Sequence, residues 1–549
     1  MAGEVSVART LSSLAAGGIV DRIWSRDHTV WHPRPDGISD RLGWLNAPDW
    51  VTPRLSEIQA FADEVIAGGI DHFVLLGMGG SSRAAKVIHR TFGNAPGHPQ
   101  MIPGESTVPA TIGAALGRID PAKTLVLISS KSGTTMEPML MYRVFRETLE
   151  REVGQEAARL RFAAITDPGT PLAELAAQER FRNIFLNDPE IGGRFSALTY
   201  FGLVPAALLG ADIGALVSGG RRMRELCKPG LPPDTNPAAV LGATIGSMAM
   251  RGRDKLTLVT SPAMFGYGLW VVQLVAESLG KNGKGVVPVA GEPLVDPDLY
   301  GRDRLFVYLR LDSDENDETD DALEAVSALG HPVITLRMPN REALGGEFFR
   351  WEMAVAVAAS VMGVNPFDQP DVQLSKDRTR TILGDFSNGP KTNNALPPIA
   401  EAPAEADKNA DTQTGQLAAL LDAAADGDYL GVLAFLPHTD AIDDALRRLR
   451  ECVLRRYRLA TTLGHGPGYL HSTGQLHKGG PDSGIFLLLT TSHSKDIPIP
   501  GHDYGLGDVT DADALGDLGA LNDLGRRVVH IVLPDDPAQS IDALTAALS

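Results

Sequence analysis

Short apolar runs followed by amphipathic stretches recur along the first third of the chain. The runs at 72–79 (HFVLLGMG), 124–130 (TLVLISS) and 161–166 (RFAAIT) are almost uninterrupted, which is typical of buried strands. The stretches at 81–92 and 136–153 follow the first two runs and predict helices. Buried strands that alternate with helices indicate a parallel sheet covered on both faces.

The same alternation starts again near residue 254 and once more after residue 413. The second series predicts strands at 255–261, 304–311 and 331–338, with helices at 262–280 and 348–363. The third series predicts strands at 429–436, 484–490 and 527–533, with a helix at 441–457.

The repeated pattern predicts an α/β protein with mainly parallel sheets and several units. A stretch rich in proline, alanine and acids, LPPIAEAPAEADKNADTQ, separates the second and third series and indicates a linker. We expect an N-terminal extension at 1–55, α/β domains at 56–215 and 216–395, a linker at 396–413 and a C-terminal α/β unit at 414–549.

Composition and charge exclude several classes of protein. The 549-residue chain has 50 basic and 68 acidic residues, a net charge of −18, which argues against non-specific nucleic-acid binding. Its two cysteines, Cys227 and Cys452, exclude a disulfide framework and a zinc site built on cysteine pairs. The start lacks the features of a signal peptide, and no apolar run approaches the roughly 18 residues of a membrane span. We therefore expect a reduced, cytoplasmic protein with no nucleic-acid or membrane partner.

Two glycine-containing turns each join a predicted strand to a predicted helix: LLGMGGSS at 75–82 and ISSKSGTTMEP at 128–138. Glycines let the backbone approach an anion, and the free N–H groups at a helix start favour negative charge. The first turn matches neither a dinucleotide fingerprint nor a Walker loop. In the second turn, helix capping explains one hydroxyl but not four hydroxyls and a lysine. Together the turns predict a phosphate site.

Three further segments carry side chains suited to acid–base chemistry. Gln273 and Glu277 share one face of a largely apolar helix, and apolar surroundings suit a general base. The alternative is an ordinary helix-end pair of Glu277 with Lys281. Arg194, in GGRFSALT, has the permanent charge that can stabilise an oxyanion. Lys376 follows a proline-bounded turn, where a lone helix lysine is usually solvated.

The stretch GYLHSTGQLHKGG at 468–480 concentrates polar side chains between glycines. It is a candidate metal site, phosphate site or catalytic-histidine segment. His465, His471 and His477 are spaced by six residues, a spacing that matches no standard ligand motif. The metal reading is therefore the weakest of the three.

Five segments point to a known family: GMGGSS, SKSGTT, GGRFSALT, QLVAESLGK and NPFDQPDVQLSK, in this order over residues 70–380. The chain resembles the phosphoglucose isomerase family. HSTGQLHKGG and the C-terminal unit are most similar to the isomerase half of bacterial transaldolase–isomerase fusions. The resemblance implies two sugar-isomerase domains of three αβα layers, followed by the C-terminal α/β unit. Because no transaldolase half precedes the first domain, we expect a stand-alone isomerase.

The family interconverts glucose 6-phosphate and fructose 6-phosphate in glycolysis and gluconeogenesis, without metal or cofactor, and the resemblance also implies a possible homodimer. It implies that Glu277 moves a proton between sugar C2 and C1 through a cis-enediol and that Arg194 stabilises the enediolate. Gln273 would contact the substrate near the base, and Lys376 with a histidine would open the sugar ring. The implied phosphate ligands are Gly80, Ser81, Ser130, Lys131, Ser132 and Thr135.

The ring-opening histidine departs from the family pattern. In typical members it lies between the base glutamate and the final lysine, and the neighbouring subunit supplies it. Only His331 lies between Glu277 and Lys376 here, without a family-like context. LHSTGQ at 470–475 is similar to the H-S-M-G-Q setting of some bacterial isomerases. We therefore expect His471, rather than His477 or another histidine, to open the ring, in its own site or in a neighbour's.

Other functions are less compatible with the sequence. A glucosamine-6-phosphate synthase needs an N-terminal glutaminase with a nucleophilic cysteine, whereas the first cysteine here is Cys227. A sugar-phosphate-binding regulator needs the phosphate turns but no base, so Glu277 and Arg194 favour catalysis. Activity on mannose 6-phosphate stays open.

Overall fold

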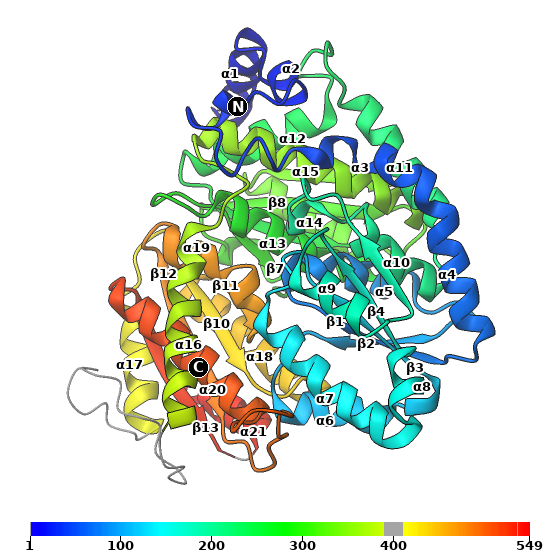
Figure 1. Ribbon diagram of the computed structural model, residues 1–549. Helices are drawn as coiled ribbons and strands as arrows, with labels where there is room; N and C mark the ends of the chain where they lie inside the picture. The colour runs from blue at the N-terminus through cyan, green and yellow to red at the C-terminus, as the bar shows by residue number, and fades with distance from the viewer. Residues whose placement is uncertain (1, 389–409, 535) are drawn as a thin grey trace.

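The protein contains three separate parallel sheets (Figure 1). The computed structural model describes residues 2–388, 410–534 and 536–549. One sheet lies within each of the ranges 56–215, 216–395 and 414–549. The expected α/β fold with parallel sheets is therefore confirmed.

The first sheet has the strand order β2-β1-β3-β4-β5. Phe73 and Leu75 of β1 face one hydrophobic core, and Val74 and Leu76 face another. Both faces are covered, which explains why this strand is apolar at every buried position. The strands are β1 (His72–Leu76), β2 (Gln100–Gly104), β3 (Thr124–Ser129), β4 (Phe162–Thr166) and β5 (Asn183–Leu186). The helices are α4 (Leu55–Ala67), α5 (Arg83–Phe92), α6 (Pro109–Arg118), α7 (Met136–Val153), α8 (Gln155–Arg159), α9 (Pro171–Gln178) and α10 (Tyr200–Leu209).

The second sheet has the order β7-β6-β8-β9 and shares a hydrophobic core with the first unit. Its strands are β6 (Lys255–Thr260), β7 (Val287–Ala290), β8 (Arg304–Leu311) and β9 (Val333–Met338). The helices are α11 (Ile213–Leu226), α12 (Pro237–Ala249), α13 (Tyr267–Leu279), α14 (Asp317–Ala328), α15 (Leu344–Met362) and α16 (Gln373–Asn388). The helix expected at 262–280 begins at Tyr267, because Pro262–Met264 form a separate 3-10 turn.

The third sheet has the order β11-β10-β12-β13. Its strands are β10 (Tyr429–Phe435), β11 (Ala460–His465), β12 (Gly484–Thr491) and β13 (Arg527–Leu533). The helices are α17 (Ala410–Asp422), α18 (Asp440–Tyr457), α19 (Gly474–Gly479), α20 (Leu506–Asp523) and α21 (Pro537–Leu548). Of the predicted linker, residues 396–409 lie outside the described residues, and α17 begins at Ala410.

Helix α16 leaves the second unit and lies along α20 of the third (Figure 1). The side chain of Thr379 on α16 meets the backbone of α20 where a glycine leaves room: a Cβ at Gly516 would lie 2.7 Å from Thr379 Oγ1. This contact brings the helix of Lys376 against the unit that carries His471.

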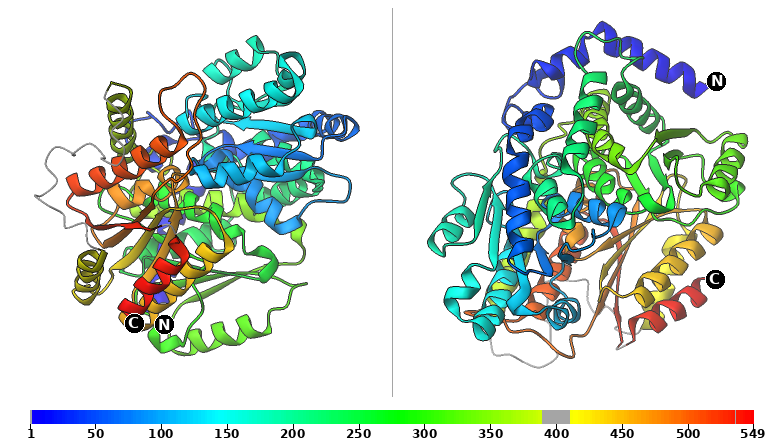
Figure 2. Two further views of the ribbon diagram at one scale, coloured as in Figure 1. Left: turned by 90° about the horizontal axis from the view of Figure 1, so that it is seen from below. Right: turned by 90° about the vertical axis from the view of Figure 1, so that its right-hand side faces the viewer.

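The N-terminal extension is helical and packs on the second unit (Figure 2). It contains α1 (Ala2–Ala16), α2 (Ile19–Trp24) and α3 (Ala47–Val51). Trp24 Nε1 donates to the Cys227 carbonyl at 2.7 Å, and Trp31 Nε1 donates to the Ala356 carbonyl at 2.8 Å. These bonds fix the extension to helices that lie far along the chain.

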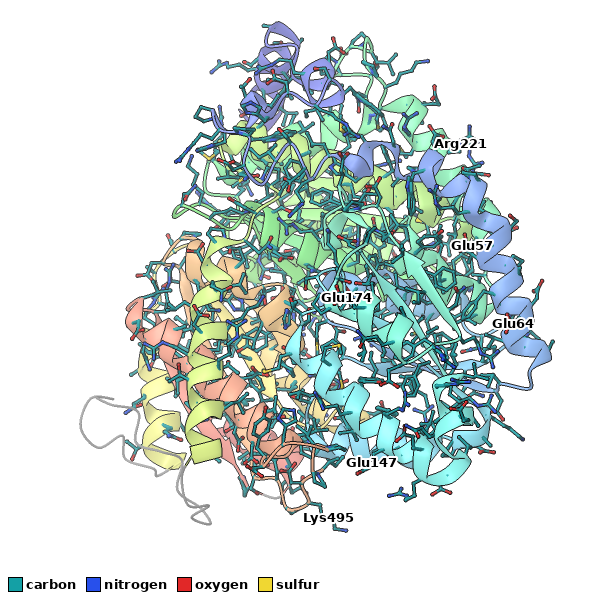
Figure 3. All side chains as sticks on the ribbon, viewed as in Figure 1. Glu57, Glu64, Glu147, Glu174, Arg221 and Lys495 are labelled. Atoms are coloured by element: carbon teal, nitrogen blue, oxygen red, sulfur yellow. The ribbon has the colours of Figure 1, made fainter. Side chains whose placement is uncertain are left out.

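Acidic side chains lie on the outer surface of α4. On α4, Ile58 and Phe61 are buried, whereas Glu57 and Glu64 project outward (Figure 3). The spacing of the buried residues is that of an amphipathic helix covering a sheet. In the described part of the chain, no helix combines the length and the apolar character that crossing a membrane requires.

Candidate functional site

A cavity of about 430 Å³ lies at the N-terminus of α7. Three parts of the chain line it: the turn at 132–137, the segment 372–380 at the start of α16, and the third unit through Leu470, His471 and Asp513. Four of the predicted site residues are in this lining: Ser132, Thr135, Lys376 and His471.

One side of the cavity carries hydroxyl groups. Ser132 Oγ and Thr134 Oγ1 lie 2.9 Å apart, and Ser130 Oγ donates to Thr135 Oγ1 at 3.2 Å. Thr135 is the N-cap of α7, an 18-residue helix whose first N–H groups and dipole favour a bound anion. This side of the cavity therefore suits a phosphate group.

Lys131 is turned away from the cavity. Its ammonium pairs with Asp167 and donates to the Pro189 carbonyl at 3.1 Å. Burial raises the pKa of Asp167, although the hydrogen bond and charge of Lys131 counter this effect. Ser130 is buried, and its hydroxyl donates a hydrogen bond to the hydroxyl of Thr135.

The cavity lining also contains a histidine–carboxylate pair. His471 Nε2 lies 2.6 Å from Glu137 Oε1, and the side chains are 16% and 6% exposed. Burial raises the pKa of Glu137, but the charge and hydrogen bond of His471 outweigh it, with help from Lys376. The net pKa of Glu137 is below its ordinary value, so this carboxyl is an anion that orients the imidazole.

Asp513 of α20 is a second carboxyl at this cavity. Burial and the charge of Glu137 raise the pKa of Asp513 well above its ordinary value, with a smaller lowering by Thr379. Within the described ranges, its buried Oδ2 has no hydrogen-bond partner. The neutral form of Asp513 is therefore favoured beside the charge of Glu137.

A second polar cluster surrounds Glu277 on α13. Arg194 Nη1 lies 3.4 Å from Glu277 Oε1, and Gln273 Nε2 donates to Glu277 Oε2 at 3.0 Å. Lys281 instead pairs with Asp368 at 2.6 Å, and burial lowers the pKa of Lys281 to about 8. The alternative of a helix-end pair between Glu277 and Lys281 is therefore not the arrangement found.

Arg194 is held by a set of fixed acceptors. Its Nε donates to Ser278 Oγ at 2.8 Å, its Nη1 to Gln369 Oε1 at 3.0 Å, and its Nη2 to the carbonyls of Pro366 and Asp368 at 2.5 and 3.1 Å. Burial lowers the pKa of Arg194, while the charges of Glu277 and Asp368 oppose this. The guanidinium therefore lies in a rigid, preorganised position next to Glu277.

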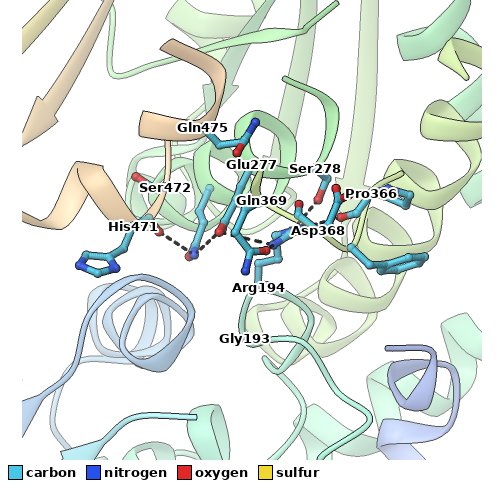
Figure 4. Close-up of polar contacts among 12 residues, drawn as sticks. Gly193, Arg194, Glu277, Ser278, Pro366, Asp368, Gln369, His471, Ser472 and Gln475 are labelled. Carbon is cyan, nitrogen blue, oxygen red and sulfur yellow. Dashed lines mark hydrogen bonds and ion pairs between the residues drawn. The ribbon is translucent and has the colours of Figure 1, made fainter. Parts of the chain in front are cut away.

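His471 connects the two clusters. Gln273 Nε2 donates to the His471 carbonyl oxygen at 2.9 Å while it also holds Glu277. Figure 4 shows the imidazole on the far side of its own backbone from Glu277. The residue thus contributes its carbonyl to one cluster and its ring to the other.

The glycines of the first turn allow it to pack closely against the backbone of neighbouring segments. Gly79 has φ +54°, and a Cβ there would lie 2.5 Å from the His471 carbonyl oxygen. A Cβ on Gly80 would lie 2.2 Å from the Gly193 carbonyl carbon, next to Arg194. The Ser81 carbonyl accepts from Ser129 Oγ at 2.6 Å. Gly80 and Ser81 are not in the described cavity lining; Gly79 and Gly80 bring the turn against both clusters.

The other histidines considered from the sequence lie elsewhere. His477 packs in a core, with its ring 4.9 Å from that of Phe486, and burial lowers the pKa of His477 to about 3. His465 Nε2 lies 3.3 Å from Asp443 Oδ1. His331 packs against the ring of Phe306. Among the residues that the structure describes, no cluster of three or more histidine, cysteine or acidic side chains could hold a metal ion.

Three residues of the site have no counterpart in the sequence predictions: Glu137, Gln369 and Asp513. Glu137 lies two positions after Thr135 in the second turn, and Gln369 lies within NPFDQPDVQLSK, so both are inside motifs that the sequence did single out. Asp513 lies in a helix rich in alanine, glycine and aspartate, where no local signal distinguishes it from solvated acids.

Comparison with known proteins identifies the family of the chain. The sequence pattern of phosphoglucose isomerase matches residues 50–286. Glucose-6-phosphate isomerase of Rubrobacter xylanophilus is 31% identical over 392 residues, which cover 63% of this chain and 90% of that protein. The enzyme of the same name from Staphylococcus saprophyticus is 29% identical over 402 residues, covering 65% of this chain and 90% of that protein.

Solved structures show the same fold. A hypothetical protein from Thermus thermophilus superposes with a TM-score of 0.61 at 27% identity, covering 68% of this chain and 97% of that one. A glucose-6-phosphate isomerase from Chlamydia trachomatis superposes with a TM-score of 0.52 at 19% identity, covering 68% of this chain and 79% of that one. From the extent and identity of the sequence matches, the chain belongs to the phosphoglucose isomerase family.

Proposed function

We propose that this protein is a glucose-6-phosphate isomerase that interconverts glucose 6-phosphate and fructose 6-phosphate. Its relatives carry that name, and its site combines an anion-binding helix start with two acid–base clusters. The observation that carries the proposal is the double role of His471. Its ring pairs with Glu137 at the cavity, and its carbonyl is bonded to Gln273, which also holds Glu277.

We place the substrate phosphate at the N-terminus of α7. Ser132 and Thr135 line the cavity there, and Ser130 supports Thr135. Lys131 would exchange its pairing with Asp167 for the phosphate. Gly80 and Ser81 would act from the adjoining turn, which touches the Arg194 loop and the His471 backbone.

Ring opening is assigned to His471 and Lys376, which both line the cavity. One side chain gives a proton to the ring oxygen as the C1–O5 bond breaks, and the other takes the proton of the C1 hydroxyl. The products are an aldehyde at C1 and a hydroxyl at C5. Glu137 keeps the imidazole of His471 in the orientation that this exchange requires.

Proton transfer along the open chain is assigned to Glu277. Its carboxylate removes the proton from C2 and returns it to C1, and the hydroxyl proton of O2 is transferred to O1. Arg194 stabilises the negative oxygen of the cis-enediol intermediate. Gln273 orients the carboxylate and contacts the substrate beside it. The close approach of Arg194 to Glu277 supports these assignments.

The family resemblance implies a homodimer. A dimer can form whether or not each site takes all of its residues from one chain. His471 and Lys376 of the same chain line one cavity, and the His471 carbonyl accepts from Gln273, which also holds Glu277. We therefore propose that a copy of this chain supplies its own ring-opening histidine.

The decisive experiment supplies fructose 6-phosphate and follows glucose 6-phosphate formation with a coupled dehydrogenase. Glu277→Gln is expected to lower kcat by roughly 10²–10⁴-fold, the usual contribution of a general base. Deuterium incorporation from D₂O into the product should fall in parallel. Glu174→Gln, on the exposed face of α9, is the matched control and should leave both rates unchanged. An inactive wild type, or full activity of Glu277→Gln, would contradict the proposal.

A further inference from the structure

A single buried carboxylate connects the segments that carry Lys376 and His471. Asp517, on α20, is completely buried, and its Oδ1 lies 2.6 Å from Lys478 Nζ. Ser375 Oγ donates to Oδ1 at 3.0 Å, and Tyr469 Oη donates to Oδ2 at 2.7 Å. All three partners are buried as well.

Each neutral partner of Asp517 lies beside a proposed ring-opening residue. Ser375 immediately precedes Lys376 on α16. Tyr469 lies two residues before His471 in the short 3-10 helix η11 (Gly468–His471). One carboxylate thus bonds to the neighbours of both residues, although these residues are 95 positions apart in the sequence, from 376 to 471.

The charge state of Asp517 strengthens these bonds. Burial raises the pKa of Asp517, but the charge of Lys478 and the hydrogen bonds from Lys478 and Tyr469 outweigh it and lower the pKa. Hydrogen bonds to an ionised acceptor are shorter and stronger than neutral ones. Since no water reaches this group, Tyr469 and Ser375 have fixed positions around it.

Asp513, one helical turn earlier on α20, provides a contrast. Asp513 lines the cavity and its pKa is raised, whereas Asp517 is not in the cavity lining and its pKa is lowered. The two acids share a helix face and differ because only Asp517 has a lysine partner. The ionised acid is therefore the one that bonds to both other segments.

We infer that Asp517 is a positioning residue for ring opening, which sets the separation of Lys376 and His471 across the cavity. Two side chains that exchange protons with one sugar ring must reach the ring oxygen and the C1 hydroxyl at the same time. Their helices belong to different parts of the chain, so a common bonded partner fixes the distance that neither helix fixes alone. The inference rests on the proposed function, because it explains how the residues of the proposed ring-opening step are positioned.

The test measures ring opening apart from proton transfer. NMR exchange between the α and β anomers of glucose 6-phosphate requires ring opening but no proton movement on carbon. All variants are made in the Glu277→Gln background, where isomerisation is blocked. Tyr469→Phe with Ser375→Ala removes both neutral bonds and leaves the ion pair of Asp517 with Lys478 intact. We expect anomer exchange to fall roughly 10- to 100-fold, which is the usual effect of removing a residue that orients another. Inhibition by inorganic phosphate should be unchanged.

The second unit offers a matched control. Tyr308 Oη and Ser261 Oγ both donate to buried Asn316 Oδ1, at 2.8 and 2.5 Å, far from the cavity lining. Tyr308→Phe with Ser261→Ala removes the same two groups from an equivalent buried position. It should lower thermal stability by a similar amount without changing anomer exchange.

The outcomes separate the two proposals. If the Tyr469–Ser375 double variant and the control exchange anomers at the same rate, the role of Asp517 is overturned and the proposed function stands. If the wild type neither isomerises nor exchanges anomers, the proposed function itself fails. Asp517→Asn is a further variant that should slow exchange still more. Because Asp517→Asn leaves Lys478 buried without a counter-charge, this variant can fail to fold. In that case the result of the double variant decides.

Discussion

Two glutamates lie on opposite sides of His471, and their partners differ in kind. Glu277 contacts the guanidinium of Arg194 at 3.4 Å and an amide of Gln273. Glu137 contacts the imidazole of His471 at 2.6 Å. The first carboxylate therefore faces a permanent charge, and the second faces an imidazole, which can donate or accept a proton.

This difference suits two separate steps of one reaction. A base that must accept and return a proton in each cycle benefits from a neighbour of constant charge, because its environment is the same at every turnover. A histidine that exchanges protons with the ring needs a carboxylate that stays ionised and keeps the imidazole oriented. The comparison predicts that the two sides of His471 can be inactivated independently.

The largest effect that separates the two sides is expected for His471→Asn. Ring opening should fall roughly 10²–10⁴-fold because an acid–base group is lost. Isomerisation should fall with it, whereas Glu277→Gln should lose isomerisation and keep anomer exchange. Both rates can be read in one NMR experiment on glucose 6-phosphate. Normal anomer exchange in His471→Asn would remove the ring-opening role.

A smaller effect is expected for Glu137→Gln, which keeps the shape and a hydrogen-bond acceptor but removes the charge. Ring opening should fall about 10- to 100-fold, the range for a residue that orients another. Since the pKa of Glu137 lies below its ordinary value of 4.5, the carboxylate persists through the neutral range. The advantage of the wild type over the variant should therefore be present at neutral pH and be lost as the pH falls far enough to protonate Glu137. Equal rates of the wild type and the variant at neutral pH would contradict the orienting role of Glu137.

No effect is expected when two inactive variants are mixed. Glu277→Gln and His471→Asn, combined after reversible unfolding, should regain no isomerase activity because both residues of a site come from one chain. In a dimer with sites shared between subunits, random pairing would restore about a quarter of the sites. Recovery near that level would show that His471 is exchanged between copies.

Most of the fold could be predicted from the apolar pattern. The predicted central strands β3, β4, β10 and β12 are buried at every position, so their sequences are continuously apolar. The strands without a prediction, β2, β5, β7 and β11, all lie at sheet edges. Their sequences QMIPG, NIFL, VPVA and ATTLGH are short or carry proline, glycine and polar residues, as edge strands often do.

The candidate site was predictable only where its chemistry is local. The turns after β1 and β3 have a glycine and hydroxyl signature that is visible in the sequence. Even so, the geometry gives Gly79 and Gly80 a packing role against His471 and Gly193. Glu137 looks like an ordinary acid in a first helical turn until tertiary packing places His471 beside it. His471 itself was found through family resemblance, since nothing in its spacing indicates which carboxylate it meets.

The burial of Asp513 and Asp517 could not be predicted from the sequence. Both are aspartates in the segment DADALGDLGALND, four positions apart, and a helical pattern with acids normally indicates a solvated face. Both are buried in the structure, because α16 covers this face of α20. Only the packing of distant helices gives Asp513 a place in the cavity lining and gives Asp517 three buried partners.

The contact between His471 and Glu137 spans 334 positions of the chain, and this has a consequence during biosynthesis. A ribosome that adds roughly 5–20 residues per second needs about 17–67 s to advance from one to the other. During that interval the nascent polypeptide contains Glu137 but not the imidazole that lies beside it in the folded protein. The histidine–carboxylate pair therefore forms only after the last α/β unit has begun to emerge.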